Sequence, residues 1–207
     1  MQKEKIDLIT VSREFGAGGR DFAAELGKRL GWDVLDQDLI RRIADRLHLE
    51  VTAVHRLDEH PPSWLARVSS ALLIAPPEMP VGVDAKQLLH MDAVARAAQS
   101  VIVEAAEHPP LIVVGHSGQN IFATRPGSLH VRLVAPIESR VKRLAERYGW
   151  DQHTATERAH HIDADRNAYA QRYYHREWRD ALLYDVVLNT GRITIAEATT
   201  LVEAMVR

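Results

Sequence analysis

The stretch over residues 5–30, KIDLITVSREFGAGGRDFAAELGKRL, restricts the possible folds more than any other part of the chain. Its apolar, β-branched start predicts a strand, which carries Ile6, Leu8, Ile9 and Val11. A loop with three glycines follows, and apolar residues at helical spacing then predict a helix that ends before Gly31. Because backbone N–H groups converge at a helix N-terminus and the helix dipole favours negative charge, this arrangement predicts an anion site, with phosphate as the expected anion. The alternative is a glycine-rich turn that needs positive φ angles and binds nothing.

The glycine loop departs from the phosphate-binding consensus G-x-x-x-x-G-K-[ST], in which a lysine reaches the phosphates and a hydroxyl group holds Mg²⁺. When Gly18 is taken as the second glycine, Gly19 occupies the lysine position and Arg13 the first glycine position. Arg20 comes one place late. Its planar guanidinium suits phosphate, although it is not equivalent to the point charge of a lysine. We therefore expect Arg20 to supply the missing cation.

Composition and charge exclude several classes of protein. The 207 residues are 46% hydrophobic and 26% charged, which is ordinary for a globular protein with a real core. A net charge of −2 gives no general electrostatic attraction to nucleic acids or membrane surfaces. The absence of cysteine excludes disulfides, thiolate metal sites and a cysteine nucleophile. With no long apolar segment in the sequence, we expect a cytoplasmic protein.

Eleven histidines raise the question of a metal site. His153, His160 and His161 would share roughly one face of a helix, but their spacing of seven and eight residues is too long for an i, i+4 ligand pair. We therefore expect these histidines to be solvated or to face phosphate rather than to bind a metal.

The remaining pattern alternates strands with helices. Further strands are expected at 33–36, 111–115, 129–135 and 185–190, and helices at 38–47, 85–107, 119–123, 136–149 and 194–206. Five strands joined by helical crossovers predict an α/β fold with a parallel sheet covered on both faces. Asp36, Asp38, Arg41 and Arg42 would then lie near the carboxyl end of a strand and face the same cleft as the glycine loop. Alternatively, they form a capped helix start with solvated arginines.

Two segments stand apart from this alternation. Residues 51–84 hold five of the nine prolines and read as an inserted segment, of the kind that often forms a lid or binding element. Residues 151–178 interleave arginines with aromatic residues, a combination found in nucleic-acid-binding proteins. Because acidic residues offset these arginines, the segment fits an arm that closes over a nucleotide better than a groove for single-stranded DNA.

In the same order along the chain stand SREFGAGGRD, DQDLIRR, VVGHSGQNIF, ERYG, IDADRNAY and YDVVLNTGRITIAEA. With these motifs the sequence resembles the cytidylate kinase-like family, a branch of the nucleoside monophosphate kinases. The resemblance covers nearly the full length and is weakest over 51–85. It implies a three-layer P-loop NTPase fold with a five-stranded parallel sheet, in a single kinase-like domain over 1–207. An NMP-binding insertion at 51–84 and a helical lid at 149–180 are also implied.

The resemblance also assigns roles to particular residues. The ATP phosphates would be held by Gly16, Ala17, Gly18, Gly19, Arg20 and Asp21, and Asp21 stands where related kinases carry a threonine near Mg²⁺. The acceptor would be bound by Asp36, Arg42, His116 and Asp163, although His116 replaces an arginine of the family pattern. Arg166 matches the lid arginine that contacts the transferring phosphates, and Arg158 is a second candidate. Residues 190–192 would pass near the adenine.

The activity that the resemblance implies is ATP-dependent phosphoryl transfer to a nucleoside monophosphate, with CMP or dCMP as the expected acceptor and ATP and Mg²⁺ as cofactors. Two alternatives stay open. Gly19 at the lysine position and His116 at the arginine position favour a nucleotide-binding protein with little catalysis. A kinase of another small-molecule acceptor is also compatible, because the fold does not fix the substrate. The expected partners are small-molecule nucleotides, not nucleic acid or membrane, with the chain acting as a monomer or a homodimer.

Overall fold

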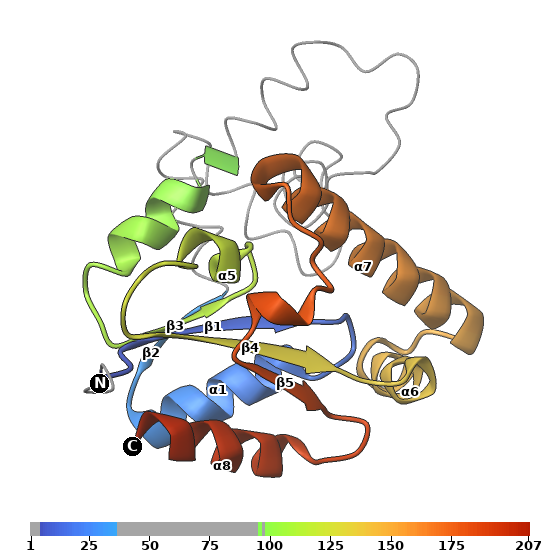
Figure 1. Ribbon diagram of the computed structural model, residues 1–207. Helices are drawn as coiled ribbons and strands as arrows, with labels where there is room; N and C mark the ends of the chain where they lie inside the picture. Colours follow the sequence, from blue (N-terminus) through green and yellow to red (C-terminus); the bar gives the residue numbers. More distant parts are fainter. Residues whose placement is uncertain (1–4, 37–94, 97) are drawn as a thin grey trace, which may run out of the picture.

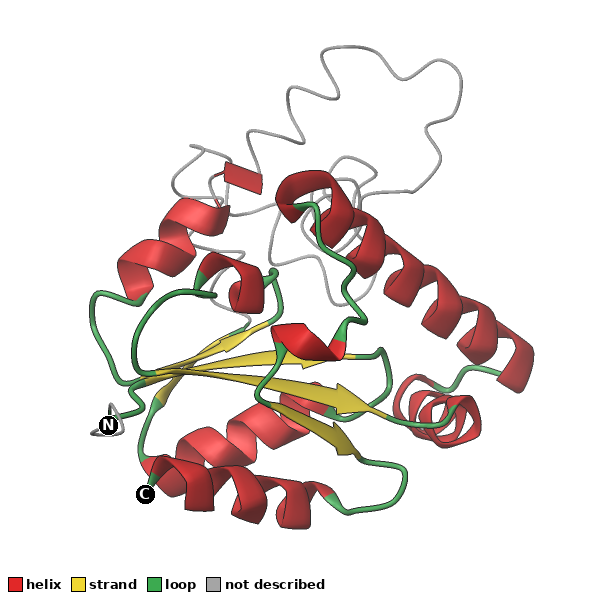
Figure 2. Cartoon of the chain, in the orientation of Figure 1, coloured by secondary structure: helices red, strands yellow, loops and turns green. Residues whose placement is uncertain are grey.

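A computed structural model describes residues 5–36, 95–96 and 98–207 of the chain. The expected helix at 38–47 and the expected insertion at 51–84 lie outside the described residues, as does Arg42. The described part contains both strands and helices, and most of its strands are followed by a helix (Figures 1 and 2).

Five strands form one parallel sheet in the order β2-β3-β1-β4-β5. Their bounds are β1 Leu8–Arg13, β2 Asp33–Leu35, β3 Leu111–Val114, β4 Ser128–Val134 and β5 Val186–Asn189. The central strand β1 is buried along almost its whole length, as expected for a parallel sheet covered on both faces. This confirms the predicted α/β class and parallel sheet.

Helices cover both faces of the sheet (Figure 1). On one face α1 (Gly19–Leu30) and α8 (Ile195–Val206) lie side by side and enclose a core with β1 and β4. On the other face a helix that ends at residue 105 and the short α5 (Gly118–Ile121) pack over a second core. The three-layer arrangement of the P-loop fold follows.

Two further helices stand beyond the carboxyl ends of β1 and β4. These are α6 (Ile137–Tyr148) and α7 (Gln152–Tyr174), which pack against each other through a small apolar cluster (Figure 1). The aspartate Asp151 caps α7 by accepting a hydrogen bond from the N–H of Thr154 at 2.8 Å. A short 3₁₀ turn, η3 (Ala181–Leu183), then leads into β5. The helices α6 and α7 therefore bring their side chains to the edge of the sheet where the glycine loop lies.

Candidate functional site

The glycine loop joins β1 to α1 and is held open by two left-handed glycines. Gly16 has φ +86° and Gly18 has φ +81°, a region that other residues rarely adopt. A Cβ added at Gly16 would also lie 2.9 Å from the carbonyl oxygen of Arg140, so this position has no room for a side chain. The first turn of α1 therefore begins directly at the loop, where its backbone N–H groups have no partner within the helix and can bind an anion.

A cleft of about 430 Å³ opens over this loop. Its walls come from the loop itself, from α1 and from α6, and Arg166 of α7 closes one side. Five arginines line it, at Arg13, Arg20, Arg143, Arg147 and Arg166. Four carboxylates line it too, at Glu14, Asp21, Asp36 and Glu146, so the cleft is polar, with a surplus of positive charge.

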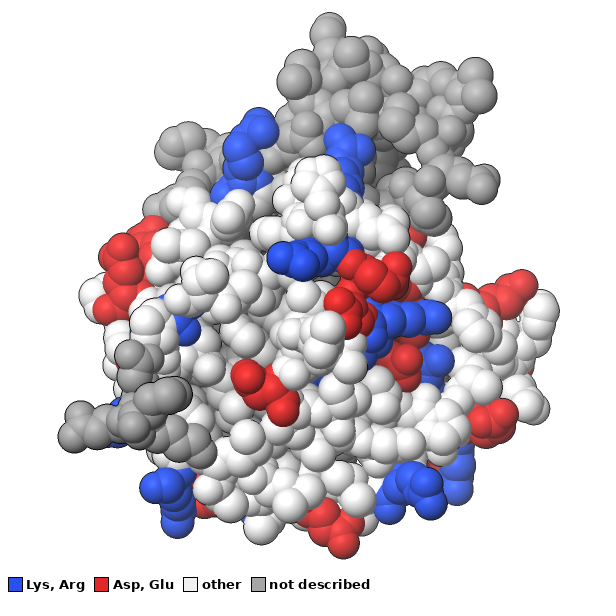
Figure 3. All heavy atoms as spheres, in the orientation of Figure 1, with Lys and Arg blue, Asp and Glu red and all other residues white. Residues whose placement is uncertain are grey.

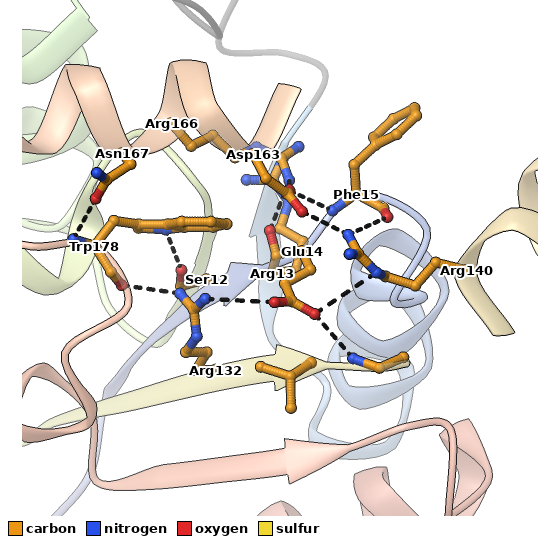
Figure 4. A network of polar contacts seen from close by, with 12 residues as sticks. Ser12, Arg13, Glu14, Phe15, Arg132, Arg140, Asp163, Arg166, Asn167 and Trp178 are labelled. Carbon is orange, nitrogen blue, oxygen red and sulfur yellow. Dashed lines mark hydrogen bonds and ion pairs between the residues drawn. The ribbon is translucent and has the colours of Figure 1, made fainter. Parts of the chain in front are cut away.

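A buried carboxylate on α7 holds the glycine loop in place (Figure 4). Asp163, 1% exposed, accepts a hydrogen bond from the backbone N–H of Phe15 at 2.8 Å and one from Nη1 of Arg140 at 2.5 Å. The guanidinium of Arg140 also donates to the carbonyl oxygen of Phe15 at 3.3 Å. The resemblance assigns Asp163 to the acceptor, whereas here its carboxylate anchors the glycine loop.

A second set of contacts ties the end of β1 to β4 and to the segment after α7 (Figure 4). Glu14 accepts a hydrogen bond from the N–H of Ala135 at 3.0 Å and lies 4.0 Å from the buried Arg132. Arg132 in turn donates to the carbonyl oxygen of Trp178 at 2.9 Å and lies 4.1 Å from the centre of its ring. The indole N–H of Trp178 donates to Ser12 at 2.9 Å. These buried contacts leave the cleft side of β1 little freedom to move.

Arg166 lies between the cleft and a smaller cavity. Its Nη1 donates to the carbonyl oxygen of Arg13 at 2.6 Å and lies 3.5 Å from Asp163 (Figure 4). Its side chain is 13% exposed, and its Nε is buried with no hydrogen-bond partner among the described residues. Burial, together with the cation of Arg13, lowers the pKa of Arg166 to about 9, so the side chain still carries its charge at neutral pH.

The smaller cavity, of about 30 Å³, lies where β3 ends. Three successive residues there have positive φ angles, Gly115 at +83°, His116 at +52° and Ser117 at +54°. Glycine adopts such angles freely, but His116 and Ser117 are strained there, and backbone strain of this kind clusters at functional sites. Gln119, 2% exposed, also lines this cavity, and its Nε2 has no hydrogen-bond partner in the described part of the chain. The lining of this cavity therefore includes the unpaired amide N–H group of Gln119 together with the side chains of Arg13 and Arg166.

The other expected site residues are placed as follows. Arg20 is 52% exposed, and its Nε lies 3.5 Å from the carboxylate of Asp36. Asp21, on the first turn of α1, lies 3.4 Å from Arg147 of α6. All of these line the main cleft. Arg158 is exposed and lies over the ring of Trp150 at 5.9 Å, outside the residues that line the cleft.

The sequence profile of the cytidylate kinase-like family matches residues 8–192, which include β1, the glycine loop, α7 and β5. The chain belongs to the cytidylate kinase-like family. It is therefore a kinase-like protein of the P-loop fold, a class that in general uses ATP and Mg²⁺ for phosphoryl transfer.

Solved structures similar to this kinase-like chain support the fold. An uncharacterized protein from Eubacterium ventriosum is 19% identical, with a TM-score of 0.70 and 98% of each chain covered. A shikimate kinase from Bacteroides thetaiotaomicron is 13% identical, with a TM-score of 0.53 and 96% of each chain covered. A shikimate kinase from Acinetobacter baumannii in complex with shikimate is 12% identical, with a TM-score of 0.54; 98% of this chain and 94% of that one are covered. At these identities the likeness concerns the fold alone.

Among curated proteins, a protein named uronate isomerase from Corynebacterium glutamicum is 31% identical over 94 residues. These residues are 44% of this kinase-like chain, which spans only 18% of the length of that relative.

Sequence reasoning missed the arginines of α6 in this kinase-like chain. Arg140 and Arg143 stand three residues apart, a spacing that places two side chains on one face of a helix. Arg143 donates to the carbonyl oxygen of Gly16 at 3.3 Å and to Oγ1 of Thr190 at 3.2 Å, and it also bonds the carbonyl oxygen of Thr190. It therefore joins the glycine loop to the segment expected near the adenine. The spacing of Arg140 and Arg143 can be read from the sequence, but the sequence does not show that this face of α6 packs against the glycine loop.

Charges on the surface of this kinase-like protein are mixed. On the face in Figure 3, basic and acidic side chains of the described residues are interspersed. Within the described residues, no group of three or more histidine, cysteine or acidic side chains is arranged to hold a metal ion by itself. No helix in that same part of the chain is both long and apolar enough to cross a membrane.

The neutral imidazole of His116 makes the stability of this kinase-like chain depend on pH. Burial, and then the cations of Arg13 and Arg166, lower the pKa of His116 to about 3. Below about pH 6.5, His116 is protonated in the unfolded chain but stays neutral in the folded chain. The free energy of unfolding therefore falls as the pH falls from about 6.5 toward 3. We expect His116 to account for a loss of about 2 kcal/mol between pH 7.5 and 5.0.

Urea denaturation at the two pH values measures this loss. Asparagine tolerates the left-handed backbone, so we expect His116→Asn to remove the His116 part of the loss. His153, an exposed histidine of α7, provides the control variant His153→Asn, which should retain it. Equal pH dependence in the wild type and in His116→Asn would contradict the assignment.

Proposed function

We propose that this protein transfers the γ-phosphoryl group of ATP to a small acceptor, with CMP or dCMP as the expected acceptor. The observation that carries the proposal is the position of Arg13 and Arg166, which line both the main cleft and the smaller cavity. Phosphoryl transfer needs in-line positioning of donor and acceptor and cations around the oxygens of the moving group. Two arginines at the junction of two cavities meet that need.

The main cleft would hold the donor. Its glycine loop and the N-terminus of α1 suit the triphosphate, and Arg20 supplies a cation at the rim. Asp21 and Asp36 line the same cleft, and carboxylate oxygens with water are the ligands that Mg²⁺ takes in such sites. They would hold the ion beside the phosphates, where it would neutralise charge on the triphosphate. The donor base would lie toward Thr190, the residue to which Arg143 is bonded.

The smaller cavity would hold the reacting end of the acceptor. In the part of the chain that the structure describes, it is lined by two arginines and by polar side chains such as His116 and Gln119, with no carboxylate. An anionic or oxygen-rich group suits such a lining, and it would satisfy the spare amide donor of Gln119. Water must leave when the lid closes, and we propose α7 as the part of the lid that carries Arg166.

A coupled assay of ATP consumption tests the proposal. CMP, dCMP, UMP and AMP are offered as acceptors, together with shikimate, the ligand named for one of the similar structures. Turnover with CMP or dCMP is the expected result. Turnover with shikimate alone would select a kinase of a non-nucleotide acceptor. Binding of ATP by calorimetry without turnover on any acceptor would instead select a nucleotide-binding protein with little catalysis.

Arg20→Ala is expected to weaken ATP binding. The guanidinium of Arg20 is half exposed at the rim and is held toward the cleft by Asp36. A contact of this kind, to a charged ligand at a partly exposed site, is worth about 1 kcal/mol, or roughly fivefold in affinity. Isothermal titration calorimetry with ATP measures it. Unchanged affinity would remove Arg20 from the phosphate site.

A further inference from the structure

The side chain of Arg13 packs against Gly19 of the glycine loop and against Gly115 at the end of β3, and a larger residue at either position would collide with it. A Cβ added at Gly19 would lie 2.5 Å from Cγ of Arg13, and one at Gly115 would lie 2.1 Å from its Nη1. Both distances are far below a van der Waals contact. Gly19 stands where the phosphate-binding consensus has its lysine, so a lysine there and the observed Arg13 exclude each other.

The guanidinium of Arg13 has no protein partner in the described part of the chain. It forms no ion pair or hydrogen bond there, although its own carbonyl oxygen accepts from Arg166. Burial and the cation of Arg20 lower the pKa of Arg13, and the carboxylates of Asp36 and Asp163 partly oppose that effect. A half-buried cation without a partner costs free energy, and an anion bound at the cleft would recover it.

Arg13 also belongs to both cavities. It lies at the carboxyl end of the central strand β1 (Figure 4), and it lines both the main cleft and the smaller cavity. The spare amide of Gln119 lies in the lining of the same smaller cavity. Arg20, by contrast, lines the main cleft and is half exposed at its rim. The junction between donor and acceptor is therefore occupied by Arg13 and not by Arg20.

We propose that Arg13 is a catalytic residue of this protein, which binds the transferring phosphoryl group in place of the lysine that the glycine loop lacks. The proposal rests on the proposed function. An ionised phosphate oxygen of the acceptor forms a bond to the γ-phosphorus, and the bond from that phosphorus to the β,γ-bridging oxygen breaks. The electron pair leaves with ADP, and no proton moves. Arg13 contacts the equatorial oxygens throughout and keeps its own proton.

Calorimetry with inorganic tripolyphosphate tests this contact apart from turnover. We expect Arg13→Gln to bind tripolyphosphate at least tenfold more weakly than the wild type and to turn over about 10³-fold more slowly. Arg13→Lys keeps the charge and should recover part of both. The double variant Arg13→Gly, Gly19→Lys moves the cation to the usual loop position and also removes the Cβ of residue 13, which a Cβ at position 19 would meet at 2.9 Å. It should bind tripolyphosphate more tightly than Arg13→Gly. Arg207→Gln, which removes one cation from the far end of α8, is the matched control.

The outcomes separate the inference from the proposed function. If Arg13→Gln melts like the wild type, binds tripolyphosphate equally well and turns over normally, the role of Arg13 is overturned and the kinase activity stands. If the wild type binds neither ATP nor tripolyphosphate, both proposals fall. A crystal structure of the wild type with tripolyphosphate needs no variant. We expect the guanidinium of Arg13 within hydrogen-bond distance of a phosphate oxygen, and a guanidinium turned away from every phosphate would overturn the inference.

Discussion

Replacement of Arg166 by glutamine is expected to lower the turnover number about 10³-fold, while the affinity for ATP changes only a few-fold. The reason is position. Arg166 lies between the two cavities and donates to the carbonyl oxygen at the end of β1, 2.6 Å away. A cation at that junction contacts the moving phosphoryl group when it lies between donor and acceptor. It therefore stabilises the transition state more than bound ATP.

The electrostatics of Arg166 support the same expectation. Burial lowers the pKa of Arg166 most, and the cations of Arg13, Arg132 and Arg140 lower it further, while the carboxylate of Asp163 raises it. This surplus of positive charge is costly in the free protein. It is relieved when negative charge gathers on the equatorial oxygens during transfer. The catalytic role proposed for Arg166 thus depends on an arrangement of charge that the folded protein already holds before substrate binds.

Steady-state kinetics with ATP and the active acceptor measure the effect, and calorimetry gives the ATP affinity separately. Arg125→Gln is the matched control, because Arg125 also forms an ion pair, with Asp7 at 2.6 Å, but at the opposite edge of the sheet. It should lose stability without loss of turnover. Comparable losses of turnover and ATP affinity in Arg166→Gln would show uniform binding and contradict the assigned role.

Most of the fold was predictable from the sequence because most elements carry their own local signal. Consecutive apolar residues predicted the buried strands β1 and β3, and apolar spacing predicted the helices α1, α6 and α8. The helix α7 was not predicted from spacing and was implied only by the helical lid of the family resemblance. The expected start of the last helix at residue 194 is confirmed, and Thr194 and Glu197 form a capping box there with both of its hydrogen bonds. The signal at each of these places lies within a few residues of the element itself.

The candidate site was predictable only where a local motif carried it. The glycine loop was predicted in this way, and Arg166 was assigned through the family resemblance, whose motifs include IDADRNAY. The roles of Arg13 and Asp163 depend instead on partners far away in the sequence. Asp163 meets the N–H of Phe15 across 148 residues, and Arg13 passes Gly115 at the end of another strand. A buried ion pair leaves no periodic pattern, so its partners appear only when the strands and α7 have been placed in space.

The largest effect on stability is expected for Asp163→Ala, which should lower the free energy of unfolding by about 3–5 kcal/mol. The change leaves Arg140, whose side chain is 7% exposed, without its 2.5 Å partner, and it leaves the N–H of Phe15 without an acceptor. For a chain of 207 residues, this corresponds to roughly 10 °C in the melting temperature. Thermal and urea denaturation measure it.

The matched control lies on the same helix. Asp151→Ala removes an exposed aspartate that caps α7, and it should lower the free energy of unfolding much less than Asp163→Ala does. A loss in Asp163→Ala no larger than that of Asp151→Ala would contradict the anchoring role. Asp163→Asn provides a milder variant, because its amide oxygen can still accept from Phe15 while the charge opposite Arg140 is lost.

Asp163→Asn also separates two roles for this residue. A carboxylate that binds the acceptor, as the family resemblance implies, would raise the KM for the acceptor when it is neutralised. A carboxylate that holds the glycine loop against Arg140 would instead raise the KM for ATP, because the loop loses its fixed shape before the triphosphate binds. The side chain of Asp163 is almost wholly buried, and both of its carboxylate oxygens already contact other groups of the protein. We therefore expect the KM for ATP to rise more than the KM for the acceptor.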